Sequence, residues 1–442
     1  MSRRAWKDTP MNLTGVAGIV LLIAVAFLLS SNRKRVSPRI VLVGLGLQLV
    51  LAFLCLRFEP VVRVFDGLAA GLARVISFAD AGTTFLFGKV GDASGPWGFI
   101  FAVRVLPVIV FFASLMSVLY YLGVMQRVVA GLAWVLRRTL RVTGTEALSA
   151  AANVFLGQTE APLTVRPYIG FMTRSQLMAV MTGGFATIAG SVMAAYVGLL
   201  GKEMPGGEVV FAKHLLTASV MSAPAGLVMA KIMLPEEGEV PLESLNSLLS
   251  APSSARNVMD AAAEGAADGL KLALNVAAML VAFVALIAML NYPLSALSEL
   301  PTVAAWREAH GVPVLSLQNI LGYLLVPVAW AMGVEWADCR NFGSLLGQQV
   351  IATEFVAYLD LANHIRATQS AEPTLSVRSC QIATYALCGF ANLPSIAIQI
   401  GGLSAMAPDR RAEIATIAPR AMVAGALACW MTGTIAGLFI AA

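Results

Sequence analysis

The sequence predicts an all-α polytopic membrane protein with eight transmembrane helices, two inverted re-entrant hairpins and interfacial helices. Three observations lead to this prediction. Of 442 residues, 58% are hydrophobic and 12% are charged, whereas a soluble domain carries about a quarter charged residues. Long runs of the chain carry no charge, and two further apolar segments each contain one interior acidic residue. So few charges cannot cover the surface of several soluble domains, which excludes a water-soluble enzyme.

A transmembrane helix needs about 20 consecutive, mostly apolar residues. Seven charge-free runs are candidates, and an eighth run, 98–125, is apolar apart from Arg104. Arg104 is expected to pair inside the bundle or to extend to the membrane surface, because an unpaired charge in lipid is costly. The seven charge-free runs are the stretch between Asp8 and Arg33, 40–56, 175–201, 214–230, 272–298, 379–408 and 421–442.

Basic residues in short loops orient the spans, because such loops stay in the cytoplasm. Lys and Arg follow the first, third and fifth predicted spans and lie between the seventh and eighth. Placing these loops inside puts both termini outside, although Arg3, Arg4 and Lys7 oppose this orientation. The net charge of +5 therefore indicates cytoplasmic loops and not a nucleic-acid partner. The first run has no cleavage site for a signal peptidase and is expected to remain as a span.

Three stretches fit no span. Residues 59–90 mix apolar and charged side chains, which is typical of a helix lying in the membrane interface. Residues 235–268 are polar and predict a loop or a short amphipathic helix. Residues 313–334 are apolar but interrupted by Pro327 and Gly333, and are interpreted as a second interfacial piece.

Segments 146–166 and 340–360 are apolar but broken. Each contains one acid, Glu160 or Glu354, and a polar, glycine-containing stretch, 157–160 or 347–349. If each segment is a re-entrant hairpin, the count of eight spans and the cytoplasmic placement of the basic loops are both retained. The two hairpins then enter the membrane from opposite sides. Broken helices that meet near the midplane are typical of transporters, where they hold substrate and ion. A carboxylate satisfied by backbone amides at a helix N-terminus is the simpler interpretation of each acid alone.

Two predicted spans carry polar clusters. Residues 182–191 combine glycines with hydroxyl groups, and composition alone favours close helix packing through small residues. The alternative is an unwound stretch whose oxygen atoms hold a hard cation such as Na⁺. Residues 389–395 place Asn392, Pro394 and Ser395 in mid-membrane, where Pro394 would free a carbonyl and Asn392 and Ser395 would share a helix face.

Other chemistry finds little support in the sequence. The five cysteines show neither a disulfide framework nor zinc spacing. A passive channel for small polar solutes and an intramembrane enzyme using Glu160 and Glu354 as acid and base both remain alternatives. The enzyme is the weaker one, because no nucleophile or metal triad accompanies the two acids.

Four motifs carry a resemblance to a known family. They are, in chain order, 157–162 (GQTEAP), 186–191 (ATIAGS), 354–357 (EFVA) and 388–392 (CGFAN). Together they resemble the concentrative nucleoside transporters of the sodium-coupled bacterial type, over nearly the whole chain from about residue 40. The resemblance implies a multi-pass protein of the cell inner membrane, a homotrimer, and nucleoside import by an elevator-like motion.

The resemblance also implies which residues bind the nucleoside. Gln158, Thr159 and Glu160 would bind the nucleobase, since an amide, a hydroxyl and a carboxylate match the polar edge of a heterocycle. Glu354, Asn392 and Ser395 would hold the ribose hydroxyls, and Phe390 would form an apolar wall.

The implied co-transported ion is sodium. Its ligands would be the side chains of Asn153 and Thr187 and the carbonyls of Leu156 and Ile188. Proton coupling through Glu160 or Glu354 is the alternative, but a proton needs no cage of neutral oxygens.

This chain departs from the family pattern at Thr353, where Asn is usual, and at Leu393 and Pro394, where Phe and a small residue are usual. The first departure bears on the support of Glu354 and the others on base selectivity or the local bend. The expected organisation is 1–144 for N-terminal spans, interfacial helix and scaffold, 145–234 for the first hairpin with spans four and five, 235–335 for the loop, span six and an interfacial segment, and 336–442 for the second hairpin with spans seven and eight.

Overall fold

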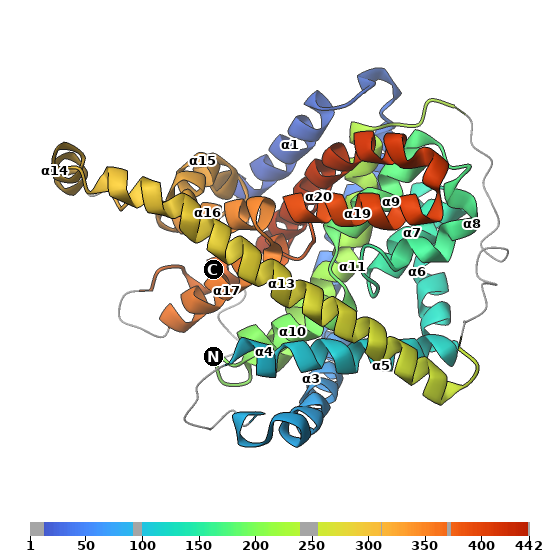
Figure 1. The fold of residues 1–442 in the computed structure, drawn as a ribbon. Helices are drawn as coiled ribbons and strands as arrows, with labels where there is room; N and C mark the ends of the chain where they lie inside the picture. The colour runs from blue at the N-terminus through green and yellow to red at the C-terminus, as the bar shows by residue number, and fades with distance from the viewer. Residues whose placement is uncertain (1–12, 92–99, 239–254, 311, 369–372, 441–442) are drawn as a thin grey trace.

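The computed structural model describes residues 13–91, 100–238, 255–310, 312–368 and 373–440. Within these ranges every regular element is a helix, which confirms the all-α prediction. Figure 1 shows the arrangement, with the long helix α13 crossing the other helices.

Six of the eight predicted spans are helical segments long and apolar enough to cross a membrane, judged on the described residues alone. The other two are shorter apolar helices: α1 (Leu13–Leu28) and the second half of the seventh predicted span, α19 (Leu393–Met406). The six are α2 (Pro38–Leu56), α4 with α5 (Phe101–Arg104 and Leu106–Tyr121), α9 with α10 (Arg174–Ala186 and Gly190–Gly201), α11 (Gly207–Met233), α13 (Val258–Ser298) and α20 (Arg411–Phe439).

The segment predicted to lie in the interface is a continuous helix, α3 (Glu59–Phe87), with one buried face. Its buried residues recur every three or four positions, as a helix packed on one side requires. Asp80 of α3 meets the buried Arg104, with 3.4 Å between Oδ1 and Nη1. Arg104 is therefore buried and paired, although the Asp80 side chain is 58% exposed, so the pair lies between the two outcomes expected for Arg104.

The structure refines or corrects three sequence interpretations. Of the loop or short amphipathic helix expected for 235–268, residues 258–268 are helical but form the first turns of the 41-residue helix α13, while 239–254 lie outside the described residues. Pro327 does not break its segment: α15 (Leu317–Ala331) continues through it and ends before Gly333, which adopts φ +86°. The basic stretch after the third span, counted above among the loops, is a helix, α6 (Val124–Leu140), with one buried face.

Both broken segments form helical hairpins. The first runs from α7 (Gly144–Asn153) through a turn into the 3₁₀ helix 161–165 and α8 (Arg166–Ile169). The second consists of α16 (Cys339–Ile351) and α17 (Glu354–Ala367), which pack against each other. Its polar stretch 347–349 lies within α16, and the turn falls at 352–353. Gln348 donates to Asp360 and Gln349 to the Gly389 carbonyl.

Two spans are interrupted where the sequence is richest in small and polar residues. Helix α9 ends at Ala186 and α10 starts at Gly190, so 187–189 is the unwound part of 182–191. Gly183 and Gly184 remain helical and give the close packing that the composition favoured. Helix α18 (Val377–Ala386) likewise stops before α19, leaving 387–392 without regular structure. Each interruption exposes backbone groups that a continuous helix would have paired.

Two packing groups of helices stand out, and α10 connects them by packing on both α5 and α11. Helix α13 packs mainly along α5, where Gly265 and Gly269 allow close approach. Helices α7, α9, α11, α18 and α20 pack on one another, and α19 joins them through α20. Helix α14 (Pro301–Ala309) follows α13 away from both groups (Figure 1).

Candidate functional site

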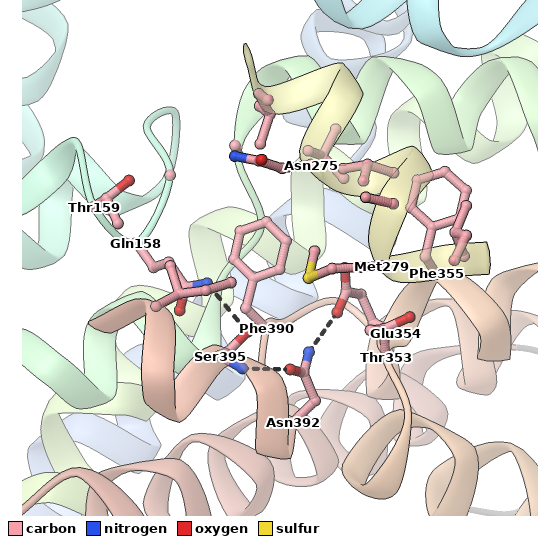
Figure 2. A pocket seen from close by; sticks show the side chains of 18 of the residues that line it. Gln158, Thr159, Asn275, Met279, Thr353, Glu354, Phe355, Phe390, Asn392 and Ser395 are labelled. Carbon is pink, nitrogen blue, oxygen red and sulfur yellow. Dashed lines mark hydrogen bonds between the residues drawn. The ribbon is translucent and has the colours of Figure 1, made fainter. Parts of the chain in front are cut away.

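One cavity of about 500 Å³ lies between the two hairpins, the two interrupted spans and α13. All seven residues assigned to substrate from the sequence line it, and so do both acids of the broken segments. Figure 2 shows 18 of its lining side chains at close range, ten of them labelled. The seven are Gln158, Thr159, Glu160, Glu354, Phe390, Asn392 and Ser395.

The first hairpin contributes its tip. Helix α7 begins with a capping box between Thr143 and Glu146 and ends at Asn153, so that the tip residues lie in a turn. Glu160 accepts a 2.9 Å hydrogen bond from the backbone N–H of Gly157, which folds its carboxylate back onto the turn. This is the simpler backbone-satisfied arrangement, although Glu160 also lines the cavity.

Gln158 is held by two partners. Its Nε2 donates to Ser395 Oγ at 3.1 Å, and its Oε1 accepts from Gln399 Nε2 at 3.3 Å. Gly184 of α9 lets the helix approach this tip, because a Cβ there would lie 2.9 Å from the Cβ of Gln158 and 2.6 Å from Gln399 Nε2.

The second hairpin contributes Glu354 at the first position of α17. Thr353 caps this helix by accepting from the N–H of Val356 at 3.3 Å, so the family departure at 353 still gives a capping residue. The Glu354 side chain is only 5% exposed. Its Oε2 accepts from Asn392 Nδ2 at 2.7 Å and its Oε1 from the hydroxyl of Tyr196 at 2.8 Å.

Asn392 ends the interrupted stretch and caps α19. Its Oδ1 accepts from the N–H of Ser395 at 2.9 Å. Pro394 stands in the first turn of this helix, where its missing N–H has no partner to lose. The expectation that Pro394 would free a carbonyl is therefore wrong, since the proline starts a helix and does not interrupt one.

These contacts form one continuous path of hydrogen bonds across the cavity wall, drawn in Figure 2. Gln158 donates to Ser395, the N–H of Ser395 donates to Asn392, and Asn392 donates to Glu354. The N-terminus of α19 thus connects the tips of both hairpins. In the same view the ring of Phe390 projects between Gln158 and Met279.

Tyr196 was missed by sequence reasoning. It lies on α10, is fully buried, and packs its ring against Phe355 and Tyr358, with centroids 4.9 and 4.2 Å apart. Its hydroxyl is the donor to Glu354. The sequence feature that could have indicated Tyr196 is a tyrosine inside an apolar span, because a buried hydroxyl needs a hydrogen-bond partner.

The four residues assigned to sodium do not line the cavity but gather behind the first hairpin tip, around the interruption between α9 and α10. The amide nitrogen of Asn153 lies 3.0 Å from where a Cβ of Gly183 would be, and the hydroxyl of Thr187 donates to the Gly183 carbonyl at 2.9 Å. Leu156 and Ile188 are brought near by the bond from the N–H of Gly190 to the Phe155 carbonyl, 2.9 Å long.

Several oxygens in this group are unused. Asn153 is completely buried, yet its Oδ1 has no hydrogen-bond partner among the described residues. The carbonyls of Leu156 and Ile188 likewise accept no backbone hydrogen bond in that part of the chain. Buried oxygens are normally paired, so this donor set fits a hard cation that takes oxygen ligands.

Comparison with known families decides the identity. The family model described as "Na+ dependent nucleoside transporter C-terminus" matches residues 214–437, more than half of the chain. The chain belongs to the Na⁺ dependent nucleoside transporter family. The N-terminal part of the same family matches residues 17–90, and "Nucleoside recognition" matches 102–203. The resemblance to concentrative nucleoside transporters is therefore confirmed.

Individual relatives agree with this family assignment. An "Uncharacterized transporter" of Haemophilus influenzae is 45% identical over 97% of this chain and 98% of its own length. Mouse "Sodium/nucleoside cotransporter 1" and human "Solute carrier family 28 member 3" are each 40% identical, over 97% and 96% of this chain. The chain spans 64% of the mouse protein and 60% of the human one.

Solved structures agree with this family in fold. CNTnw in an inward-facing substrate-bound state superposes with a TM-score of 0.86 at 42% identity, covering 97% of this chain and 98% of that one. A CNTnw variant in an outward-facing state gives 0.85 at the same identity and covers 98% of each chain. This nucleoside transporter is thus a multi-pass membrane protein, and the named relatives are transporters and not enzymes.

Proposed function

We propose that the chain is a sodium-driven symporter that imports nucleosides across the cell inner membrane. The observation that carries this proposal is the hydrogen-bonded path from Gln158 to Glu354, which joins both hairpin tips along one wall of a single cavity. A volume of about 500 Å³ lies in the usual range for small-molecule sites, about 300–1,000 Å³.

The two ends of the path suit the two halves of a nucleoside. Gln158, Thr159 and Glu160 present amide, hydroxyl and carboxylate groups to the base. Glu354 keeps lone pairs beyond the two used by Asn392 and Tyr196, and a carboxylate that accepts from sugar hydroxyls forms short, charge-assisted bonds. Phe390 would pack against the face of the base or the sugar.

Sodium would bind to Asn153, Thr187 and the carbonyls of Leu156 and Ile188, next to the hairpin tip. The unpaired buried Oδ1 of Asn153 supports this assignment. The bound ion would hold the turn that carries Gln158 and Glu160 in its substrate-binding form. A neutral nucleoside moving with one Na⁺ carries one charge, and about 2.3 kcal/mol per 100 mV then supports roughly 50-fold accumulation.

The movement we propose is elevator-like, in a homotrimer with eight spans and two re-entrant hairpins. Helices α13 and α5 would belong to the static scaffold, while the hairpins with α9, α18 and α19 would move with the substrate. The division into two packing groups supports this, as does the largely apolar, exposed surface of α13, which suits lipid or a neighbouring protomer. The boundaries expected near residues 145, 235 and 336 stay part of this proposal.

Uridine uptake into proteoliposomes tests the function. An inward sodium gradient should drive accumulation above the external concentration, and dissipating the gradient should abolish it. Uptake that follows an imposed proton gradient instead would assign coupling to protons, with Glu160 or Glu354 as carrier. Uptake that only equilibrates would indicate a passive channel, and chemical change of the nucleoside in detergent would indicate an enzyme.

A further inference from the structure

Asn275 is the one polar residue in a long apolar stretch of α13. From Leu272 to Leu290, all residues except Asn275 are apolar. A carboxamide within the hydrocarbon region is costly unless it has a hydrogen-bond partner, and polar residues there usually serve function or helix association. The stretch was read in the sequence as a plain span, so this residue entered no site prediction.

Asn275 is exposed where it lines the cavity, and its side chain makes no hydrogen bond within the described part of the chain. Asn291, further along the same helix, provides a contrast. Its Nδ2 donates to Gln318 Oε1 at 3.0 Å and its Oδ1 accepts from the N–H of Leu317 at 2.8 Å. Asn291 therefore connects α13 to α15, whereas nothing in the described fold explains Asn275.

Asn275 lines the substrate cavity from the wall opposite the hairpin tips. Helix α13 supplies several lining residues, and Asn275 is the polar one among them. In Figure 2 its carboxamide lies toward the side of Thr159 and Phe390, whereas Met279, one turn later on the same face, lies nearer Glu354. The position corresponds to the end of the cavity assigned above to the base.

We propose that Asn275 contacts the nucleobase and contributes to the selection among bases. This inference rests on the proposed nucleoside transport. A carboxamide is both donor and acceptor, so it complements a base edge that places a carbonyl beside an N–H or an amino group. Bases with this pattern would make the contact and bases without it would not, whereas the sugar contacts of Glu354 would be the same for both.

The test compares KM values in proteoliposomes for wild type, Asn275→Leu and Asn275→Ala. The panel contains uridine, cytidine, adenosine, inosine and benzimidazole riboside, whose base has no exocyclic polar group. Leu274→Ala is the matched control, because its side chain is 59% exposed on the same helix and does not line the cavity. Loss of one hydrogen bond should raise KM about 10-fold for the natural nucleosides that use it.

The expected result is a changed ratio of KM values among the natural nucleosides, with benzimidazole riboside unchanged, in both Asn275 variants and not in Leu274→Ala. An equal change for every substrate, or no change, would overturn the assignment of Asn275 and give it a structural role. Wild-type protein without sodium-stimulated uridine uptake would instead overturn the proposed function on which the inference rests.

Discussion

The hydroxyl of Tyr196 donates a 2.8 Å hydrogen bond to Oε1 of Glu354, and both side chains are buried. Asn392 donates to the other carboxylate oxygen at 2.7 Å. Two donors from two different helices therefore fix the carboxylate in one orientation. Pre-orientation of this kind lowers the cost of binding, because the group does not have to be ordered by the substrate.

Tyr196→Phe should weaken the binding of ribonucleosides. The substitution keeps the ring that packs on Phe355 and Tyr358 but removes the donor to Glu354. A hydrogen bond to a charged group contributes about 1.5–3 kcal/mol, so we expect the KM for uridine to rise at least roughly 10-fold. Uptake kinetics in proteoliposomes measure this.

Tyr358→Phe is the matched control, because Tyr358 is equally buried and its hydroxyl donates to the Thr384 carbonyl at 2.8 Å. It should lower thermal stability without changing the selectivity between uridine and its deoxy analogues. If both variants change the KM for uridine alike, Tyr196 supports only the fold.

Glu354→Gln should discriminate between sugars. The variant loses the charge that strengthens bonds from the ribose hydroxyls, so the loss of affinity should be about 10- to 100-fold for uridine. It should be much smaller for 2′,3′-dideoxyuridine. Competition against labelled uridine measures both.

Glu160→Gln provides the comparison, because Glu160 lies at the other end of the path. Its losses should be similar for uridine and the dideoxy analogue. Equal losses for the two sugars in Glu354→Gln would remove Glu354 from the sugar contact.

Thr187→Val should raise the sodium concentration required for half-maximal uptake. The variant keeps the volume of the side chain but removes a hydroxyl oxygen next to Gly183. At saturating sodium the KM for uridine should approach that of wild type, because the ion and not the substrate has lost a ligand.

Thr182→Val is the control for this change, since the buried Thr182 hydroxyl has no partner among the described residues and is not assigned to the ion. Its sodium dependence should match wild type. An unchanged sodium dependence in Thr187→Val would remove that hydroxyl from the proposed sodium site.

Lys231→Met should destabilise the protein strongly. Lys231 Nζ lies 2.5 Å from Glu146 Oε1 and 2.9 Å from Ser175 Oγ, and the Lys231 and Glu146 side chains are 8% and 1% exposed. Removing one partner leaves an uncompensated buried charge, which typically costs about 3–5 kcal/mol. Thermal unfolding in detergent should therefore shift to clearly lower temperature.

The double variant Lys231→Met with Glu146→Gln should recover part of this loss, because the remaining carboxylate near Lys231, that of Glu236, is 26% exposed and still accepts from Thr173. Arg63→Ala should have almost no effect, since its 2.9 Å pair with Glu59 is 78% and 70% exposed. A Lys231→Met protein as stable as wild type would show that the buried ion pair contributes little.

Much of this architecture could be predicted from the sequence, because lipid imposes a simple requirement on it. Every charge-free run contains helix in its described part, with breaks at 187–189 and 387–392, and the hairpin tip at 157–160 was located by one acid in an apolar segment. Eight full-length spans were predicted, but the described part of α1 is short and the seventh run is divided between α18 and α19. An apolar window gives the same average for a straight helix and an interrupted one.

The site residues that the sequence analysis did not find were missed for a different reason. Tyr196 lies beyond the polar cluster of its span, and Asn275 stands in a span that reads as plain apolar helix. Their importance depends on which side chain or cavity lies opposite. Helix α6 was taken for a loop because its arginines obscured the buried face. Tertiary packing decides such positions, and spacing along one chain does not contain it.

Equilibrium binding of uridine to the purified protein, titrated at several sodium concentrations, tests the central claim most directly. If the ion orders the first hairpin tip, each ligand must raise the affinity for the other by the same factor. We predict that uridine binds tightly in sodium and at least roughly 10-fold more weakly in choline, a coupling of about 1.4 kcal/mol. Uridine affinity that does not depend on sodium would contradict the account.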